Sequence, residues 1–391
     1  MLVSIVIPHH TESKEMMYNL FSMLYMQIGI KKEDYEILLC NDDKNGTITD
    51  FHEWPGMQIK NLECIKVGYP GVSRQVGLDA ATGKWILFID ADDAIMRTDL
   101  LGTIIGLNEN QVDLMFTSFI EESPNGVQYL PMNSGLTWLF GNVYRNGFLK
   151  EHGIRFHNNL RWQEDSFFNQ MVAAYNPRIV SDPNFRYYVW KWNGNSITRN
   201  GGAKYSWEGD LNYVDCFDYL IQELKLRNAK PEYIEKQIKH ILVYSWVSTS
   251  RQIFSSNKEA IAFLPQIIAR IKEFLLKYKN DYTLDKTEFA LLARDYYINT
   301  CKHLDVFFPK YNPFECIERI AGVENIPYKD KGITKDGIPQ QTQEAKPIAN
   351  EQLVDSAIKQ ISQEQKEAMF NGQLAAPRQE VNEGPAEQKA E

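Results

Sequence analysis

The chain has 391 residues, of which 43% are hydrophobic and 12% aromatic, a composition typical of a folded protein with two or three domains. Its formal net charge of -9 argues against a general nucleic-acid-binding protein but leaves room for a small basic groove that binds a phosphorylated ligand. The five cysteines are scattered without a CxxC pair, which argues against a disulfide framework or a zinc site and favours a reducing compartment, the cytoplasm.

The N-terminal region predicts an α/β domain built on a mostly parallel sheet flanked by helices. Apolar strand-like runs at 2–8, 35–40, 62–67, 84–90 and 112–120 alternate with helix-like stretches at 16–27, 71–81 and 97–108. Strands that are apolar throughout are typical of parallel sheets covered on both faces. Residues 137–199 continue the mixed α/β character, with an extended segment at 178–190. In such sheets ligands bind beyond the carboxyl ends of the strands.

The remaining chain predicts a small helical domain followed by a disordered tail. Stretches at 231–247, 264–278 and 286–304 repeat apolar residues at helical spacing and carry mixed charge opposite, which favours a helical core over membrane-lying helices. After residue 331 the chain is rich in Gln, Glu, Ala and Pro and cannot bury enough surface to fold alone. One apolar island around Leu353 could dock on a partner or on the body of the protein, or form only a transient helix without function. We therefore expect three parts, 1–202, 203–330 and 331–391.

The first residues, "MLVSIVIPHH", lack a basic leader and predict a first strand rather than a signal peptide. No run reaches the roughly 18 to 20 apolar residues that a membrane-spanning helix needs. We therefore expect a soluble protein without an integral membrane segment.

Polar side chains follow the predicted strands where a ligand would bind. If the strands are parallel, these groups gather along one rim of the sheet, and such a rim suits a nucleotide bound through its base, its phosphates and a divalent cation. They are Pro8, His9 and His10 after the first strand, Asn41, Asp42 and Asp43 after the second, Arg74 on the next helix, and Asp90, Asp92 and Asp93 after the fourth strand.

The acidic run after the fourth strand has two interpretations. In an extended chain residues i and i+2 point the same way, so Asp90 and Asp92 can face one site, and carboxylate oxygens suit Mg²⁺ or Mn²⁺ shared with a diphosphate. Alternatively Asp92 or Asp93 only caps the following helix. A lone DxD arises often by chance, so the neighbouring rim groups favour the cation. We expect Asp93 to do no more than start the next helix.

Four stretches together resemble the family 2 glycosyltransferases of the GT-A fold: "VSIVIPHH", "YEILLCNDD", "GVSRQVGLDAATGKWILFIDADD" and "NLRWQEDSFF". They occur in the family's order over about the first 200 residues, and jointly they are specific although none is so alone. The resemblance implies a nucleotide-sugar donor (a UDP-sugar foremost), Mn²⁺ or Mg²⁺, and transfer with inversion at the sugar carbon.

The resemblance also implies roles for the rim residues. Pro8 and His9 would line the nucleoside pocket, and Asn41 and Asp42 would meet the base. Arg74 would contact base or phosphate, Asp90 the ribose or the metal, and Asp92 would be the principal metal ligand. His9-His10 departs from the usual aromatic-Asn pair and Asn41 replaces the usual first acid, which leaves the identity of the base open. His10 could equally be a satisfied polar residue at a strand end.

The Glu164-Asp165 pair matches the family's acidic motif, and an inverting transfer needs a carboxylate to take the proton of the acceptor hydroxyl. We expect Asp165 to be this base, with Glu164 second. Alternatively the acids only favour the start of a helix.

Acceptor-side and lid residues are also implied. Trp162 could stack on a sugar or pack in the core. Residues 190–199 resemble a loop of the family in which Ser196, Thr198 and Arg199 could close over the diphosphate, while Trp190 and Trp192 shape the acceptor cleft. Relatives sometimes supply a metal-binding His in this loop, and this chain has none there. Gly141 and Asn142 are weaker acceptor-side candidates.

The leading hypothesis is a metal-dependent inverting glycosyltransferase of glycan or surface polysaccharide synthesis. An inactive nucleotide-sugar or glycan-binding assembly protein of the same fold is the alternative, against which both acidic motifs argue. A dinucleotide-dependent oxidoreductase needs a glycine-rich turn after the first strand, and "IPHHTESK" contains no glycine. The acceptor stays open among a glycan, a lipid-linked sugar, a protein and modified nucleic acid. The helical region and tail could mediate a homo-oligomer or bind a partner.

Overall fold

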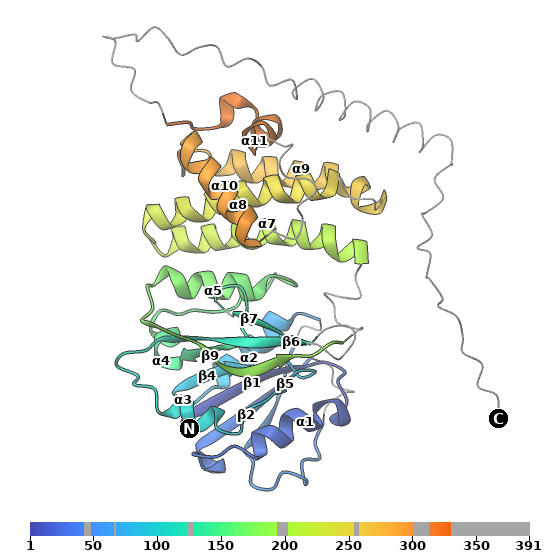
Figure 1. Ribbon diagram of the computed structural model, residues 1–391, viewed down its shortest axis with the longest axis vertical. Helices are drawn as coiled ribbons and strands as arrows, with labels where there is room; N and C mark the ends of the chain where they lie inside the picture. Colours follow the sequence, from blue (N-terminus) through green and yellow to red (C-terminus); the bar gives the residue numbers. More distant parts are fainter. Residues whose placement is uncertain are drawn as a thin grey trace, which may run out of the picture. The chain divides into compact units, whose positions relative to one another are not determined.

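A computed structural model describes residues 1–42, 48–65, 68–122, 129–133, 135–193, 202–253, 258–300 and 313–329 (Figure 1). Contacts group Met1–His303 and Pro313–Lys329 into one compact unit. The predicted boundaries at 202 and 330 stay predictions.

Four parallel strands form the first half of the sheet, in the order β3-β2-β1-β4. They are β1 (Val3–His9), β2 (Tyr35–Asn41), β3 (Ile59–Glu63) and β4 (Trp85–Phe88). Alternate residues of β1 face opposite layers: Ile5 and Ile7 pack with α1 (Lys14–Tyr25), whereas Val6 meets Gly77 of α2 (Pro70–Ala80). The short 3₁₀ helix η1 (Lys32–Asp34) leads into β2. The predicted α/β start is confirmed.

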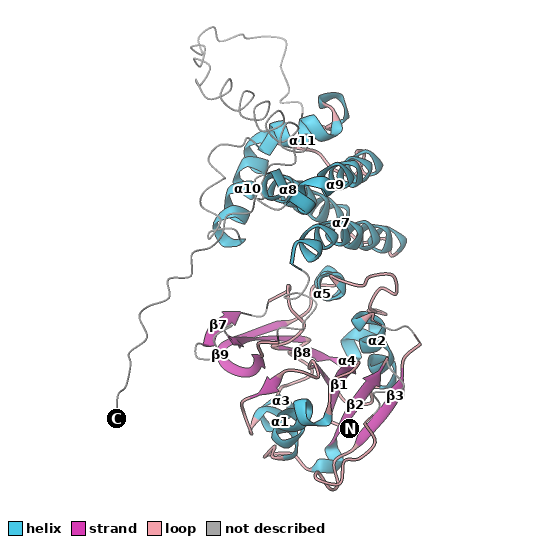
Figure 2. Cartoon of the chain, turned by 90° about the vertical axis from the view of Figure 1, so that its right-hand side faces the viewer, coloured by secondary structure: helices cyan, strands magenta, loops and turns pink. Residues whose placement is uncertain are grey.

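The second half of the sheet is mixed, in the order β4-β8-β6-β9-β5, with β7 paired to β6. Strand β8 (Asn142–Arg145) runs antiparallel to both β4 and β6 (Leu114–Glu122), while β9 (Ile179–Trp190) runs parallel to β6 past a bulge near Ser118. Strand β5 (Ala94–Ile95) pairs antiparallel with β9, and strand β7 (Tyr129–Asn133) pairs antiparallel with β6. Three further helices accompany the sheet: α3 (Leu100–Ile105), which lies beside α1 (Figure 2), α4 (Asn146–Glu151) and α5 (Glu164–Ala174).

The helical region is present as predicted from the apolar periodicity. Its described elements are α7 (Gly202–Leu226), α8 (Pro231–Ile253), α9 (Lys258–Lys277), α10 (Lys286–Thr300), α11 (Pro313–Ala321) and the 3₁₀ helix η5 (Val323–Asn325). Ile267, Ile271 and Phe274 of α9 are fully buried, spaced three to four residues apart as an amphipathic helix requires. Within the described part of the chain, no helix combines the length and apolarity needed to cross a membrane.

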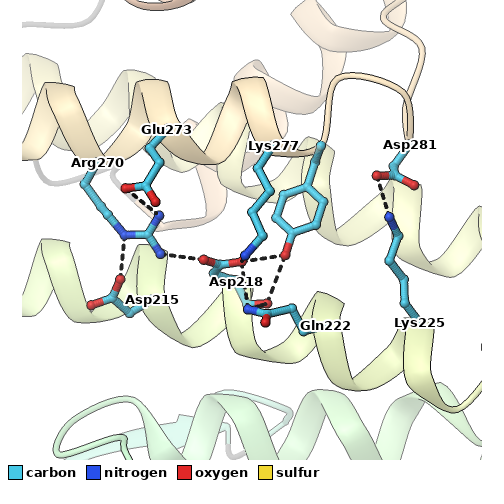
Figure 3. A network of polar contacts seen from close by, with 9 residues as sticks. Asp215, Asp218, Gln222, Lys225, Arg270, Glu273, Lys277 and Asp281 are labelled. Carbon is cyan, nitrogen blue, oxygen red and sulfur yellow. Dashed lines mark hydrogen bonds and ion pairs between the residues drawn. The ribbon is translucent and has the colours of Figure 1, made fainter.

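A charged network links α7 to α9 (Figure 3). The carboxylate of Asp218 accepts hydrogen bonds from Arg270 Nη2 at 2.7 Å and Lys277 Nζ at 2.6 Å, and from the hydroxyl of Tyr278. Arg270 Nε also donates to Asp215 at 2.7 Å. Burial alone would raise the pKa of Asp218, but these donors together lower it. The buried charge is therefore fully compensated.

Helix α7 also packs on α5, which begins with the predicted acidic pair. Cys216 Sγ donates to the carbonyl of Gln163 at 3.4 Å, directly before that pair. Near the other end of α5, the Tyr233 hydroxyl donates to the Gln170 carbonyl at 2.9 Å. The helical region thus supports the helix that carries the acids.

Candidate active site

The ends of β1 and β2 lie side by side because His9 and Asn41 are register partners. His9 is buried, with its Nδ1 2.8 Å from Asn41 Oδ1 and its Nε2 2.8 Å from the Glu12 carbonyl oxygen. His9 therefore joins the two strand ends and the following loop. Pro8 is half-buried beside it and pairs with Cys40.

Asp42 is the buried acid at this rim. Its Oδ1 lies 2.5 Å from Nδ1 of His10, and its Oδ2 accepts the backbone N–H of Gly68 at 2.8 Å. The His10 side chain is 46% exposed, so it can leave Asp42 without disturbing the core. Asp42 is therefore held on one side by a half-exposed histidine and on the other by a backbone N–H. Asp43, Ser196, Thr198 and Arg199 lie outside the described residues.

Arg74 joins the two predicted acidic motifs. Its Nη2 donates to Asp90 Oδ1 and its Nη1 to Glu164 Oε1, both at 2.6 Å. The guanidinium is buried, and its Nε has no hydrogen-bond partner among the described residues. The Arg74 guanidinium thus binds one carboxylate from the end of β4 and one from the start of α5.

Helix α2, which carries Arg74, sits close to its neighbours because two positions lack side chains. A Cβ on Gly71 would lie 2.8 Å from Glu164 Cβ, and one on Gly77 would lie 2.5 Å from Val6 Cγ1. Both distances are shorter than packed side chains allow. The two glycines therefore set the distance of α2 from α5 and from the sheet.

The acidic run after β4 forms a turn rather than the extended chain expected from its sequence, because the N–H of Asp93 donates to the carbonyl of Asp90 at 3.1 Å. Asp90 and Asp92 nevertheless lie close enough to interact. Burial raises the pKa of Asp92, and the charges of Asp90 and Glu12 add to the rise, while a hydrogen bond from Asn193 opposes it.

The prediction that Asp93 only starts the next helix is wrong. Helix α3 begins seven residues later at Leu100, whereas the carboxylate of Asp93 is buried and accepts from the Tyr188 hydroxyl and from the N–H of Lys191 at 2.8 Å. Burial raises the pKa of Asp93 well above its ordinary value, and Asp92 and Asp90 add to the effect. Asp93 fastens the end of β9 to the acidic turn.

A divalent cation fits the chemistry of this turn. Asp90 and Asp92 are hard oxygen donors, and their crowding with Glu12 leaves an excess of negative charge that a cation would relieve. Among the described residues, no three His, Cys, Asp or Glu side chains are arranged to hold a metal. An ion held here would therefore draw further oxygen ligands from elsewhere, such as a diphosphate.

The acidic pair opens α5 behind a strained residue. Gln163 has φ 65°, in the left-handed region that costs a non-glycine residue about 1–3 kcal/mol, and its carbonyl accepts from Phe167 at 3.1 Å. Burial raises the pKa of Glu164, an effect that the Arg74 guanidinium opposes. Burial also raises the pKa of Asp165 to about 7, and the adjacent Glu164 contributes to this shift. Asp165 is thus the carboxyl poised to exchange a proton near neutral pH.

The predicted acceptor residues differ in what they contact. Asn142 is fully buried, and its Nδ2 donates to the carbonyls of Gly135 at 2.8 Å and Trp138 at 2.7 Å. This corrects the prediction that Asn142 binds an acceptor, because a ligand cannot reach a side chain enclosed in this way. Its neighbour Gly141 has φ 77° and accepts a hydrogen bond from Thr117 through its carbonyl.

The tryptophan side chains proposed for the acceptor side are more exposed than Asn142. Trp162 is half-buried with the Arg161 guanidinium over its ring, 5.3 Å from the centroid. Trp192 is 38% exposed, whereas Trp190 packs on Trp138 with ring centroids 5.5 Å apart. Trp162 and Trp192 therefore stay acceptor-side candidates, whereas Trp190 belongs to an aromatic cluster with Trp138 and Phe140.

Sequence reasoning missed Glu12, Gln163 and Asn193. Glu12 and Asn193 reach the acidic turn from loops after β1 and β9, and only the folded chain brings Asn193 to Asp92, 101 positions away. A possible signal was polar loop residues directly after two strands of one sheet.

Comparisons with known proteins agree with this geometry. Residues 4–175 match the family model described as "Glycosyl transferase family 2". The chain is 24% identical over 300 residues to the "Uncharacterized glycosyltransferase EpsJ" of Bacillus subtilis, covering 63% of this chain and 85% of that protein. It is also 24% identical over 216 residues to the "Poly(ribitol-phosphate) beta-N-acetylglucosaminyltransferase TarS" of Staphylococcus aureus, covering 51% of this chain but only 37% of TarS.

The fold is similar to that of crystallised TarS. The structure of TarS 1-349 in complex with UDP-GlcNAc aligns with a TM-score of 0.56 and 18% identity, over 72% of this chain and 84% of that chain. The sheet with its acid-lined edge is thus a GT-A glycosyltransferase fold. Residues 4–175 of this chain are a family 2 glycosyltransferase domain.

Proposed function

We propose that this protein transfers a sugar from a UDP-sugar to an acceptor hydroxyl, with inversion at the sugar carbon and with a divalent cation. The observation that carries the proposal is the Arg74 bridge at 2.6 Å, which brings the acidic turn after β4 and the acidic pair of α5 to one site. Donor-binding acids and a proton acceptor are the two groups that such a transfer needs side by side.

Donor binding is proposed at the rim of β1, β2 and β4. Asp42 would read the base once His10 moves away, with Pro8, His9 and Asn41 supporting the pocket. Asp90 and Asp92 would hold Mn²⁺ or Mg²⁺, which when bound neutralises charge on the departing diphosphate. Ser196 and Arg199 are proposed to close over the diphosphate. TarS, which shares the fold, has been crystallised with UDP and with UDP-GlcNAc, and this supports a UDP-sugar as the donor class.

Asp165 is proposed as the base. Its carboxylate takes the proton of the acceptor hydroxyl while that oxygen forms a bond to the sugar's anomeric carbon. The bond from this carbon to the diphosphate oxygen breaks, and UDP leaves with the electron pair. A pKa of about 7 suits this role, because a base works best when its pKa lies near the operating pH. Arg74 and Glu164 hold the start of α5 in place.

The acceptor is proposed to be a glycan or surface polysaccharide, because two of the relatives are named as poly(ribitol-phosphate) transferases. This chain covers about a third of the length of each of them, so their acceptor specificity does not carry over directly. We propose that Trp162 and Trp192 contact the acceptor, that the helical region supports α5, and that the protein works in the cytoplasm.

The test is a panel of nucleotide sugars assayed with and without Mn²⁺ for thermal stabilisation and UDP release. We expect a UDP-sugar to raise the melting temperature more with Mn²⁺ and to be turned over. Asp92→Ala should lose the Mn²⁺-dependent part of both signals, while Asp295→Ala on α10, a surface aspartate 57% exposed, should keep both. Binding without turnover of any donor would favour the inactive assembly protein instead, and a Mn²⁺-dependent shift that survives in Asp92→Ala would overturn the ligand assignment.

A further inference from the structure

The segment directly after β9 is fastened by its own backbone to the acidic turn and to the end of β6. The N–H of Lys191 donates to Asp93 Oδ1, and the N–H of Trp192 donates to Glu122 Oε2, each at 2.8 Å. Two backbone hydrogen bonds from successive residues to buried or partly buried carboxyl groups fix the path of this segment. They bring the next side chain, Asn193, to Asp92, with Nδ2 2.9 Å from Oδ2.

The position of Asn193 matters because the carboxylates of the turn do not complete a cation site. Among the described residues, no three acidic, His or Cys side chains are placed to hold a metal ion by themselves, and Oδ1 of Asp90 is already engaged by Arg74. Mg²⁺ and Mn²⁺ prefer a full set of oxygen ligands. A neutral amide oxygen would extend the set without adding negative charge to a turn where Asp90 and Glu12 already repel Asp92.

We propose that Asn193 is a further ligand of the divalent cation, through its amide oxygen, beside Asp90 and Asp92. In this structure the amide nitrogen faces Asp92, as expected when a carboxylate needs a donor. Turning the terminal amide over exchanges its nitrogen and oxygen at almost the same positions. A cation bound to Asp92 attracts the oxygen instead. The inference rests on the proposed function, since it requires the cation.

A purely orienting role for Asn193 is the competing explanation. As a hydrogen-bond donor it would hold Asp92 in place, and its loss would weaken cation binding without changing what binds the ion. As a ligand, its loss would leave a coordination position for water. The number of water molecules on the bound ion therefore separates the two roles, whereas enzymatic activity does not.

The experiment measures Mn²⁺ binding to the full chain with UDP present. Free Mn²⁺ is followed by electron paramagnetic resonance, and water on the bound ion by ¹⁷O-water relaxation. We expect Asn193→Ala to weaken Mn²⁺ binding by about 10-fold or more, with about one additional water on the bound ion. Asn193→Asp, which keeps an oxygen ligand, should retain the wild-type water number. Asn110→Ala, an exposed asparagine, should match wild type in both measurements.

Two results would overturn the ligand role. One is unchanged Mn²⁺ affinity in Asn193→Ala, and the other is weaker binding with an unchanged water number. Melting temperatures measured without Mn²⁺ show whether each variant is folded. Failure of the wild-type protein to bind Mn²⁺ with UDP would instead contradict the proposed metal dependence itself, and the ligand role with it.

Discussion

Two buried groups of charges in this protein are built in opposite ways. In the helical region, Asp218 receives hydrogen bonds from Arg270, Lys277 and Tyr278, and its pKa falls below the ordinary value. Around the rim of the sheet and the start of α5, Asp92, Asp93 and Asp165 all have raised pKa values, and the buried Arg74 pairs with their neighbours Asp90 and Glu164.

This difference in charge compensation distinguishes a network that stabilises the fold from a cluster that is suited to bind a ligand. A buried charge whose partners all lie within the protein is compensated as soon as the chain has folded, and it needs no ligand. A cluster left with excess negative charge is less stable alone, and it favours partners that arrive later, a cation or a proton. The variants below test this contrast, in order of decreasing effect.

Asp165→Asn should have the largest effect, on rate. Removing the proton acceptor should lower sugar transfer by roughly 100- to 10,000-fold, with donor binding unchanged, as measured by UDP release and by thermal shift with the donor. Because the pKa of Asp165 lies near 7, wild-type activity should rise with pH through that region. Glu164, Arg74 and Asp90 face this carboxyl, and Tyr144, Tyr213 and Cys216 lie close enough to be affected by it.

Stability should move the other way with pH. The folded state holds a proton on Asp165 that the unfolded chain releases near pH 4, so this group's contribution falls as pH rises from about 4 to 7. Above pH 7 the asparagine variant should therefore be the more stable protein. A variant that transfers sugar at the wild-type rate would contradict the base assignment.

Arg74→Met should have the largest effect on folding. Removing the guanidinium leaves Asp90 and Glu164 without their common partner, and breaking a buried pair costs about 3–5 kcal/mol. Urea unfolding measures this loss, and Mn²⁺ should recover part of it by replacing positive charge near Asp90. An unfolding free energy equal to wild type would mean that the bridge does not hold the two motifs.

Asp218→Asn should cost less, about 1–3 kcal/mol, because the amide keeps some hydrogen bonds and Arg270 keeps Asp215, while Lys277 loses the carboxylate it pairs with. The lowered pKa of Asp218 stabilises the wild-type fold above the unfolded value near 4, and this is lost as pH falls through the folded pKa. Urea unfolding at pH 7 and pH 3 measures both parts. Sugar transfer below the melting temperature should be unchanged, and a rate loss would contradict the structural role.

Arg155→Gln should have the smallest effect. Arg155 and Asp79 form an ion pair in which the side chains are 57% and 51% exposed, and exposed pairs contribute under about 1 kcal/mol. The same urea titration should find it close to wild type. A loss of unfolding free energy comparable to that of Arg74→Met would show that burial does not determine how much an ion pair contributes to stability.

The parallel half of the fold was predictable because it rests on local pattern. Apolar runs ending in polar residues marked β1, β2 and β4, and parallel pairing then required His9, Asn41 and Asp90 to approach one edge. The antiparallel insertion of β8 between β4 and β6 depends on pairing over about 60 residues, and no local pattern reports that.

The acids of the site were predictable in identity but not in their contacts. Asp93 looked like a helix start because the following residues allowed one, and only the fold brings Tyr188 to it. Asn142 matched a family stretch, yet its burial depends on the loop around Trp138. The Arg74 bridge to Glu164 spans 90 positions and has no signature in either segment.

The close approach of α2 to its neighbours bears on how this enzyme can be engineered. Gly71 and Gly77 allow α2 to approach its neighbours closely, since a single methyl group at Gly71 would clash with Glu164 and one at Gly77 with Val6. Libraries that seek new acceptors can vary the surface around Trp162 and Trp192, the residues proposed to contact the acceptor. The same libraries should leave these two glycines unchanged. A larger distance between α2 and its neighbours would shift the position of Arg74, and with it the geometry in which every other substitution is tested.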